Sequence, residues 1–279
     1  MHLHRHRFWF WAIFLLLVCM GIGYLIYQYP QAQICSPLSK VPGMRSCIVE
    51  SKKIADVFTF ACEPNAIFVF DLDNTLICTP TGLGSDQWFS HAVEQKIQMG
   101  IPYEDAVKEV LPNYFRVQEF IALQPVETVT PNIVSRIGKQ AHTLALTARS
   151  LPLVQRTIDQ LKKLEISFSA PPSFDRELSI QLDHPGLLKD GIIFCDQNDK
   201  GKFLFYIFKK FNYQPTWIIF VDDRLFNVLN VQKECLMQNV RFVGIRYRYM
   251  DERADNFDAK KANEEYKQLI EHGAPLPAI

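Results

Sequence analysis

The chain has 279 residues, enough for one large α/β domain, or for a core with a smaller cap, once a targeting segment is set aside. Lys plus Arg and Asp plus Glu number 30 each, so the formal net charge is zero and no nucleic-acid partner is predicted. The seven cysteines contain no C-x-x-C pair, which argues against a metal held by thiolates.

The first feature along the chain is an uncharged apolar stretch over residues 8–27. About 20 residues of α-helix span the hydrocarbon core of a bilayer. Two tryptophans and two tyrosines lie near the ends of the stretch, where aromatic rings favour the membrane interface. We therefore predict a transmembrane anchor or signal segment over residues 1–28, followed by a linker over residues 29–45.

The charges that flank this stretch predict its orientation. Arg5, Arg7 and three histidines precede it, whereas the fifteen residues after it carry only Lys40. Positive flanks stay cytoplasmic, so the following domain is expected outside the cytoplasm, in the periplasm of a Gram-negative cell. An uncleaved membrane anchor is favoured because a signal-peptide core is shorter, about 7–15 residues. Secretion after signal cleavage is the alternative.

The domain beyond the linker is predicted over residues 46–279, beginning with a helix over residues 46–62. After this helix, continuous apolar runs typical of buried parallel strands alternate with amphipathic helical stretches. The strands are expected at 66–70, 143–146, 192–195, 217–221 and 240–245, and the helices at 151–164, 203–211 and 225–237. This alternation predicts an α/β fold with a doubly wound parallel sheet.

The first two of these strands are separated by about 70 residues, which is too long for a simple crossover connection. Ser85 is predicted to N-cap a helix that runs to about residue 99, and further helical stretches follow at 103–110 and 113–123. We interpret residues 78–128 as a helical cap inserted into the core.

Polar side chains follow the predicted strands at their carboxyl ends. They are Asp71 and Asp73 after the first strand, Thr147 after the second, and Asp222 with Asp223 after the fourth, while Lys200 precedes a helix. In open parallel sheets ligands bind at this edge, so these sequence-distant residues are expected to converge. An Asp-x-Asp turn alone occurs often by chance, whereas this joint placement is far harder to obtain.

Two carboxylates at one strand end suit phosphoryl transfer. Asp71 and Asp73 are two residues apart, so their side chains can face the same side of an extended segment. One carboxylate can attack phosphorus while the other handles the proton. Asp222 or Asp223, with Asp71 and the carbonyl of Asp73, offers the hard oxygen ligands that Mg²⁺ prefers.

Four short motifs, in this order, resemble those of haloacid dehalogenase-like phosphatases. They are FDLDNTL at 70–76, LTAR at 146–149, Lys200 with Gly201, and FVDD at 220–223. The stretch LGSDQWF at 83–89 is similar to a signature of an uncharacterised bacterial branch of that superfamily with an N-terminal membrane segment.

The resemblance implies Mg²⁺-dependent hydrolysis of a small phosphate monoester through an aspartyl-phosphate on Asp71, with Asp73 as general acid and base. Thr147 and Lys200 would hold the phosphoryl oxygens and offset their charge, and Lys202 is the alternative to Lys200. Arg149 is a candidate contact for the substrate phosphate, with a surface salt bridge as the other interpretation.

Two other functional classes were weighed against this one. A receiver-like regulatory domain also phosphorylates an aspartate, but its acidic pair comes first and its acceptor aspartate later, the reverse of the order in this chain. A non-catalytic, membrane-tethered interaction protein that retains the fold stays open as the alternative, because fold does not imply function. The filled motif positions favour the enzyme.

Overall fold

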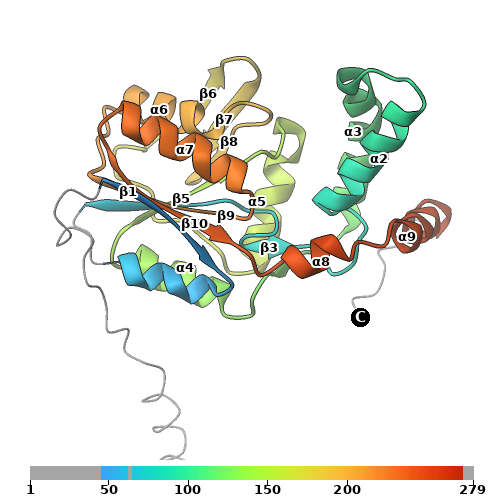
Figure 1. Ribbon diagram of the computed structural model, residues 1–279, viewed down its shortest axis with the longest axis horizontal. Helices are drawn as coiled ribbons and strands as arrows, with labels where there is room; N and C mark the ends of the chain where they lie inside the picture. Colours follow the sequence, from blue (N-terminus) through green and yellow to red (C-terminus); the bar gives the residue numbers. More distant parts are fainter. Residues whose placement is uncertain (1–44, 62–64, 273–279) are drawn as a thin grey trace, which may run out of the picture.

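The computed structural model of the protein describes residues 45–61 and 65–272 (Figure 1). Its centre is an eight-stranded sheet with the order β1-β10-β9-β2-β5-β8-β7-β6. The parallel strands are β1 (Ser46–Ser51), β2 (Ala66–Phe70), β5 (His142–Thr147), β8 (Ile192–Phe194), β9 (Trp217–Asp222) and β10 (Arg241–Tyr247). An antiparallel hairpin, β6 (Leu178–Gln181) and β7 (Pro185–Lys189), extends the sheet beyond β8. The predicted α/β class is confirmed.

Helices cover both faces of this sheet (Figure 1). One face carries the 3₁₀ helix η2 (Ile54–Phe60), α4 (Thr130–Gly138) and α5 (Val154–Lys163), and the other carries α6 (Lys200–Lys210) and α7 (Leu225–Met237). The 3₁₀ turn η3 (Leu151–Leu153) leads into α5. These elements enclose two apolar cores, one on each side of the sheet.

Strand β2 shows why a continuous apolar run forms a central strand. Phe68 and Phe70 pack into the core beside α4, whereas Ile67 and Val69 pack into the core beside α6 and α7. Successive strand side chains point to opposite faces, so a strand covered on both sides must be apolar at every position. All four of these side chains are fully buried, and they hold the carboxyl end of β2 rigidly in place.

The predicted helix over residues 46–62 is wrong in its first part. Residues 46–51 form the edge strand β1, parallel to β10, and only η2 is helical. The segment is too short for periodicity to separate a strand from a helix, and the β-branched pair Ile48 and Val49 favours the strand. Ser51 then stops the strand, because its hydroxyl accepts a hydrogen bond from the amide of Lys53 at 2.9 Å.

The insertion between β2 and β5 contains α2 (Asp86–Gln98) and α3 (Tyr103–Phe120). Its two ends meet in a small antiparallel pair, β3 (Ile77–Cys78) with β4 (Gln124–Pro125). Ser85 caps α2 by accepting a hydrogen bond from the Trp88 amide, as predicted. The two stretches predicted at 103–110 and 113–123 are instead one helix, because α3 continues through Pro112.

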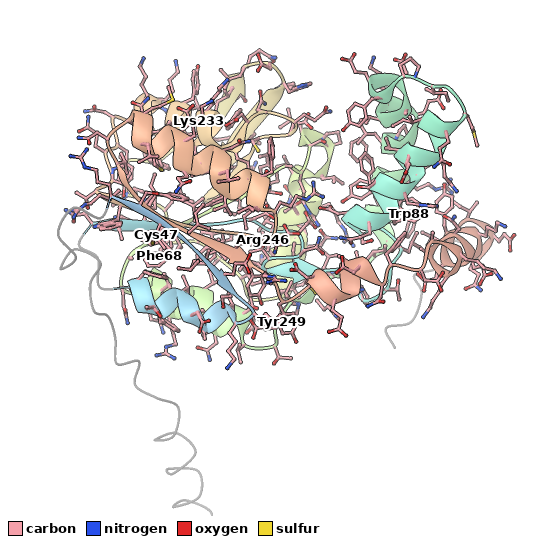
Figure 2. All side chains as sticks on the ribbon, in the orientation of Figure 1. Cys47, Phe68, Trp88, Lys233, Arg246 and Tyr249 are labelled. Atoms are coloured by element: carbon pink, nitrogen blue, oxygen red, sulfur yellow. The ribbon has the colours of Figure 1, made fainter. Side chains whose placement is uncertain are left out.

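Two C-terminal helices, α8 (Asp251–Asp255) and α9 (Ala259–His272), run beneath this insertion, whose helices α2 and α3 are called the cap below (Figure 1). Trp88 of α2 packs against Tyr266 of α9 with ring centroids 5.4 Å apart, and its indole N–H donates to Asn263 (Figure 2). Trp88 therefore fastens the cap to the C-terminal helix and leaves the other side of α2 to face the sheet edge.

The predicted membrane anchor at 1–28 lies outside the described residues, as does all of the predicted linker except Arg45. Within residues 45–61 and 65–272, none of the helices has the length and apolar character that crossing a bilayer requires. The anchor therefore stays a prediction from sequence.

Candidate active site

Sheet register places Asp71 beside the fourth motif. Phe70 pairs with Val221 of β9 on one side and with Ala145 of β5 on the other. The Asp71 amide then donates to the Val221 carbonyl at 2.8 Å, which extends the ladder by one residue. Asp71 is therefore a buried carboxylate at the carboxyl edge of the sheet, directly next to Asp222.

A tight turn after Asp71 holds the first motif in shape. The amides of Thr75, Leu76 and Ile77 all donate to the Leu72 carbonyl, and Asn74 adopts a φ of 59°. Asparagine tolerates this left-handed conformation better than most residues. The hydroxyl of Thr75 accepts a hydrogen bond from the Asp223 amide at 3.1 Å, so the turn supports the fourth motif directly.

Lys200, rather than Lys202, faces the carboxylates. It is the first residue of α6, and its Nζ lies 2.5 Å from Asp71 Oδ1 and 2.8 Å from Asp222 Oδ2. Gly201 allows this approach, since a Cβ there would lie 2.6 Å from the Asn230 carbonyl oxygen of α7. Lys202 is exposed. The helix start and the missing side chain at 201 together bring a buried cation to the strand ends.

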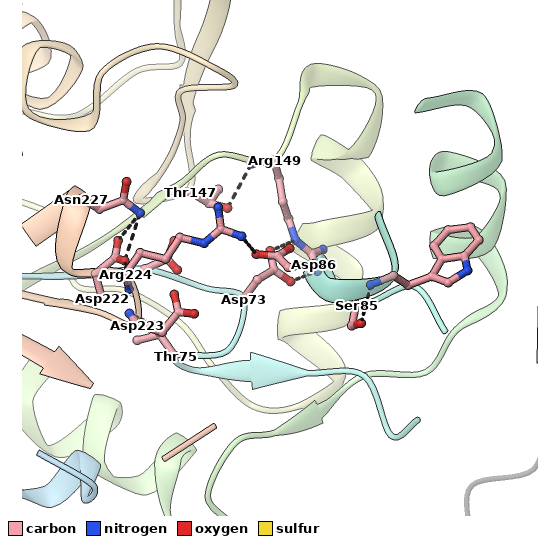
Figure 3. Close-up of polar contacts among 12 residues, drawn as sticks. Asp73, Thr75, Ser85, Asp86, Thr147, Arg149, Asp222, Asp223, Arg224 and Asn227 are labelled. Carbon is pink, nitrogen blue, oxygen red and sulfur yellow. Dashed lines mark hydrogen bonds and ion pairs between the residues drawn. The ribbon is translucent and has the colours of Figure 1, made fainter. Parts of the chain in front are cut away.

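The Asp222 carboxylate has three partners, of which Asn227 is seen in Figure 3. Besides Lys200, it accepts hydrogen bonds from the Arg224 amide at 2.8 Å and from Asn227 Nδ2 at 3.0 and 3.1 Å. The neighbouring Asp223 carboxylate makes no hydrogen bond or ion pair to any other described residue. Asp222 is thus structurally fixed, while the oxygens of Asp223 are open to a ligand.

Three carboxylates form a compact oxygen cluster. One oxygen from each of Asp71, Asp222 and Asp223 lies within 4.8 Å of the other two. Burial raises the pKa of Asp71 to about 7; the charge of Lys200 opposes this rise and that of Asp222 adds to it. Burial, followed by the charges of Asp71 and Asp222, also raises the pKa of Asp223. The three carboxyl groups thus repel one another, and Lys200 is in contact with two of them.

Asp73 points away from this cluster and pairs with Arg149 (Figure 3). The guanidinium donates to both Asp73 oxygens, from Nε at 2.8 Å and from Nη2 at 2.7 Å. Its Nη1 donates to Thr157 Oγ1 and to Gln160 Oε1 of α5. Arg149 is only 4% exposed, so the surface salt bridge considered from sequence is a buried one that fixes Asp73.

Thr147 closes the site on the β5 side. It is buried, and its hydroxyl accepts a hydrogen bond from the Arg149 amide at 3.2 Å. Register places it opposite Phe194 of β8, one strand away from Asp71. The predicted residues of the first, second, third and fourth motifs therefore do converge on one edge of the sheet.

A cavity of about 270 Å³ lies between this edge and the cap. Asp71, Asp73, Thr147, Arg149 and Lys200 line its floor. The cap contributes the roof of the cavity, which is mostly apolar and is made of Phe89, Tyr103, Val107, Leu111 and Tyr114. The cavity thus has a charged floor and an apolar roof.

An ion pair between the cap and the core lies at the side of this cavity. Arg224 Nη2 lies 2.8 Å from Asp86 Oδ2, at the start of α2 (Figure 3). Neither this pair nor Asn227, which lies behind Asp222, was predicted from the sequence. Asn227 could have been predicted from its position, because it lies five residues after Asp222, in the first turn of the helix that follows. Nothing local pointed to Asp86 and Arg224 as partners.

The chain belongs to the family described as "Protein of unknown function (DUF2608)", which matches residues 49–272. It is 28% identical to a "Putative outer membrane protein" of Chlamydia pneumoniae over 188 residues, which covers 67% of this chain and 70% of the relative. A protein of the same name from Chlamydia muridarum is 24% identical over 77% of this chain and 81% of its own length.

Two solved structures with some likeness to this chain are named as haloacid dehalogenase-like hydrolases. A hydrolase of that family from Streptococcus pneumoniae has a TM-score of 0.38 and 15% identity, covering 64% of this chain and 92% of its own. A HAD-superfamily hydrolase, subfamily IA, from Geobacter sulfurreducens has a TM-score of 0.35 and 11% identity. The match covers 67% of this chain and 95% of that hydrolase.

Proposed function

We propose that this protein is a Mg²⁺-dependent phosphohydrolase that cleaves small phosphate monoesters through an aspartyl-phosphate on Asp71. One observation carries the proposal: a buried Asp71 carboxylate lies on a cavity floor, in contact with a buried lysine and within 4.8 Å of two further carboxylates. A nucleophilic carboxylate beside positive charge is the arrangement that phosphoryl transfer through a covalent intermediate requires.

In the first step an Asp71 oxygen attacks phosphorus, the ester P–O bond breaks, and Asp73 gives its proton to the departing oxygen. In the second step water attacks the phosphorus of the aspartyl-phosphate, Asp73 takes a proton from that water, and inorganic phosphate leaves Asp71. A carboxylate offers about four lone-pair sites, so the two bonds from Arg149 leave room for a proton on Asp73. Arg149 is a positioning residue that orients Asp73.

Lys200 and Thr147 act on the phosphoryl group itself. Lys200 Nζ would balance negative charge on the phosphoryl oxygens, and Thr147, which lines the same floor, would contact them through its hydroxyl. The donor set of Asp71, Asp222 and Asp223 fits Mg²⁺, because all three offer hard oxygen atoms and Asp223 has no other partner among the described residues. Bound Mg²⁺ would neutralise charge on the transferring group.

The two adjacent aspartates are expected to respond differently to substitution. Asp223→Asn removes the open carboxylate, so the Mg²⁺ concentration for half-maximal activity should rise by roughly 10- to 100-fold. Asp222→Asn should also lower the melting temperature, because its carboxylate holds Lys200 and Asn227. Mg²⁺ titration of p-nitrophenyl phosphate hydrolysis and thermal unfolding measure the two effects.

Asp196→Asn is the matched control, since Asp196 lines the same cavity without belonging to the three-carboxylate cluster. Its Mg²⁺ dependence should equal that of the wild type. Unchanged Mg²⁺ dependence in both Asp223→Asn and Asp222→Asn would show that the metal site is wrong. Absence of any hydrolysis by the wild type, with or without Mg²⁺, would favour the non-catalytic interaction protein.

We further propose that the enzyme works in the cell envelope, anchored by residues 8–27 with its catalytic domain outside the cytoplasm. The outer-membrane names of the relatives and the charge asymmetry around this stretch support the location. Alkaline phosphatase fused after Ile279, in a strain that lacks its own, should be active. A cytoplasmic fluorescent reporter at the same point should be dark, and strong fluorescence there would reverse the assigned orientation.

A further inference from the structure

Helix α3 brings two tyrosines to the roof of the cavity, the exposed Tyr103 and the buried Tyr114. Tyr114 is 9% exposed and lines the cavity together with Val107 and Leu111 of the same helix. Its ring packs edge-on against Phe89 of α2, with centroids 5.2 Å apart. Since Phe89 and Tyr114 come from different cap helices, their contact also fixes where the Tyr114 ring lies.

The hydroxyl of Tyr114 has no hydrogen-bond partner within the described part of the chain. Tyrosine hydroxyls in apolar surroundings usually find a hydrogen-bond partner, and the cavity that Tyr114 lines is where one can enter. Burial raises the pKa of Tyr114, and the negative charge of Asp73 adds to this rise. The phenol therefore stays neutral and can donate a hydrogen bond to an acceptor that enters the cavity.

The cations that line the cavity are already engaged. Arg149 is held by Asp73, Thr157 and Gln160, and Lys200 lies between two carboxylates. Arg224 is paired with Asp86 at the side. Beyond the floor, no described lining residue offers an unpaired positive charge to a second phosphate or a carboxylate. The roof therefore offers no partner to a second anionic group, and its apolar lining disfavours burial of any unpaired charge.

The volume of the cavity bears on the size of the alcohol part of the substrate. Its volume of about 270 Å³ falls just below the usual range for sites of drug-sized ligands, about 300–1,000 Å³. A phosphate on the floor leaves room under the roof for a compact group only.

We propose that the cap selects phosphate monoesters of compact, neutral, mainly apolar alcohols that carry one oxygen acceptor for the Tyr114 hydroxyl. This inference rests on the proposed phosphohydrolase function, and Tyr114 is its specificity-determining residue. Phe89, Val107 and Leu111 contact the carbon skeleton of the alcohol, while the Tyr114 hydroxyl recognises its oxygen.

Binding of non-cleavable phosphonates separates this recognition from catalysis. Phenylphosphonate and its 2-, 3- and 4-hydroxy analogues are titrated by calorimetry into the full chain with Mg²⁺. The best hydroxy analogue should bind about 5- to 10-fold more tightly than phenylphosphonate, as expected for one hydrogen bond to a buried group. Tyr114→Phe should bring this ratio to about one. Tyr266→Phe, which alters a tyrosine on the far side of α2, should leave the ratio unchanged.

A Tyr114→Phe protein with the wild-type ratio, or tighter wild-type binding of adenosine 5′-monophosphate than of every arylphosphonate, overturns the inference. Hydrolysis of phenyl phosphate is measured in parallel and tests the proposed function by itself. Selective phosphonate binding without hydrolysis contradicts the phosphohydrolase but retains the pocket chemistry. Hydrolysis without selectivity contradicts only the role of Tyr114.

Discussion

Replacing Asp71 with asparagine should lower kcat by on the order of 10⁴-fold or more, because the residue that forms the covalent bond to phosphorus is lost. An amide is a far poorer nucleophile than a carboxylate, while its size and shape are nearly the same. The measurement is kcat for p-nitrophenyl phosphate under saturating Mg²⁺.

The fall in kcat of Asp71→Asn should result from the missing nucleophile and not from a change in the folded structure. Asp71→Asn removes one of three carboxylates that repel one another, and Lys200 keeps its ion pair with Asp222 at 2.8 Å. The variant is therefore expected to unfold in urea in the same way as the wild type, with the two transitions measured side by side. Turnover above a tenth of the wild-type value in a well-folded variant would contradict Asp71 as the nucleophile.

Replacing Lys200 with methionine should have the largest effect on stability. Lys200 is 4% exposed and neutralises Asp71 and Asp222, of which the latter is fully buried. Removing one partner of a buried ion pair leaves uncompensated charge and costs about 3–5 kcal/mol of unfolding free energy. Methionine keeps most of the side-chain volume, so the effect should come from the lost charge. Urea unfolding without divalent metal measures it.

Lys202→Met provides the matched control on the same helix. Lys202 is exposed, so its replacement should change the unfolding free energy by less than about 0.5 kcal/mol. Added Mg²⁺ should restore part of the stability lost in Lys200→Met, because a cation at the same carboxylates binds only the folded state. A larger loss in Lys202→Met than in Lys200→Met would reverse the choice between the two lysines.

The sheet could be predicted because its central strands are covered on both faces. Runs such as residues 66–70 and 217–221 are apolar at every position, a pattern that few other local structures share. The same reasoning failed at the sheet edges. β1 is short and half-buried, and β7 begins with Pro185 and Gly186, two residues that argue against a strand. Gly186 is needed there because a Cβ would lie 2.3 Å from the Phe203 ring.

The order of strands and helices was enough to predict that the site residues converge. It was not enough to predict which side chains pair with one another within the site. Parallel strands bring Asp71, Thr147 and Asp222 to one edge whatever their separation in sequence. The position of a guanidinium depends on tertiary packing, and α5 supplies Thr157 and Gln160, which draw Arg149 toward Asp73. No local pattern encodes that choice, so the sequence favoured neither role for Arg149.

The covalent intermediate itself provides the most direct test of the central claim. Asp73→Asn keeps the Asp71 nucleophile but lacks the group that deprotonates the attacking water, so turnover should fall by roughly 10²- to 10⁴-fold. With p-nitrophenyl phosphate, whose leaving group needs little protonation, the first step should continue and the phosphoenzyme should accumulate. Rapid acid quench followed by intact-mass analysis should then show one added phosphoryl group on Asp73→Asn and none on Asp71→Asn. An adduct of equal amount on Asp71→Asn, or normal turnover by that variant, would contradict the mechanism.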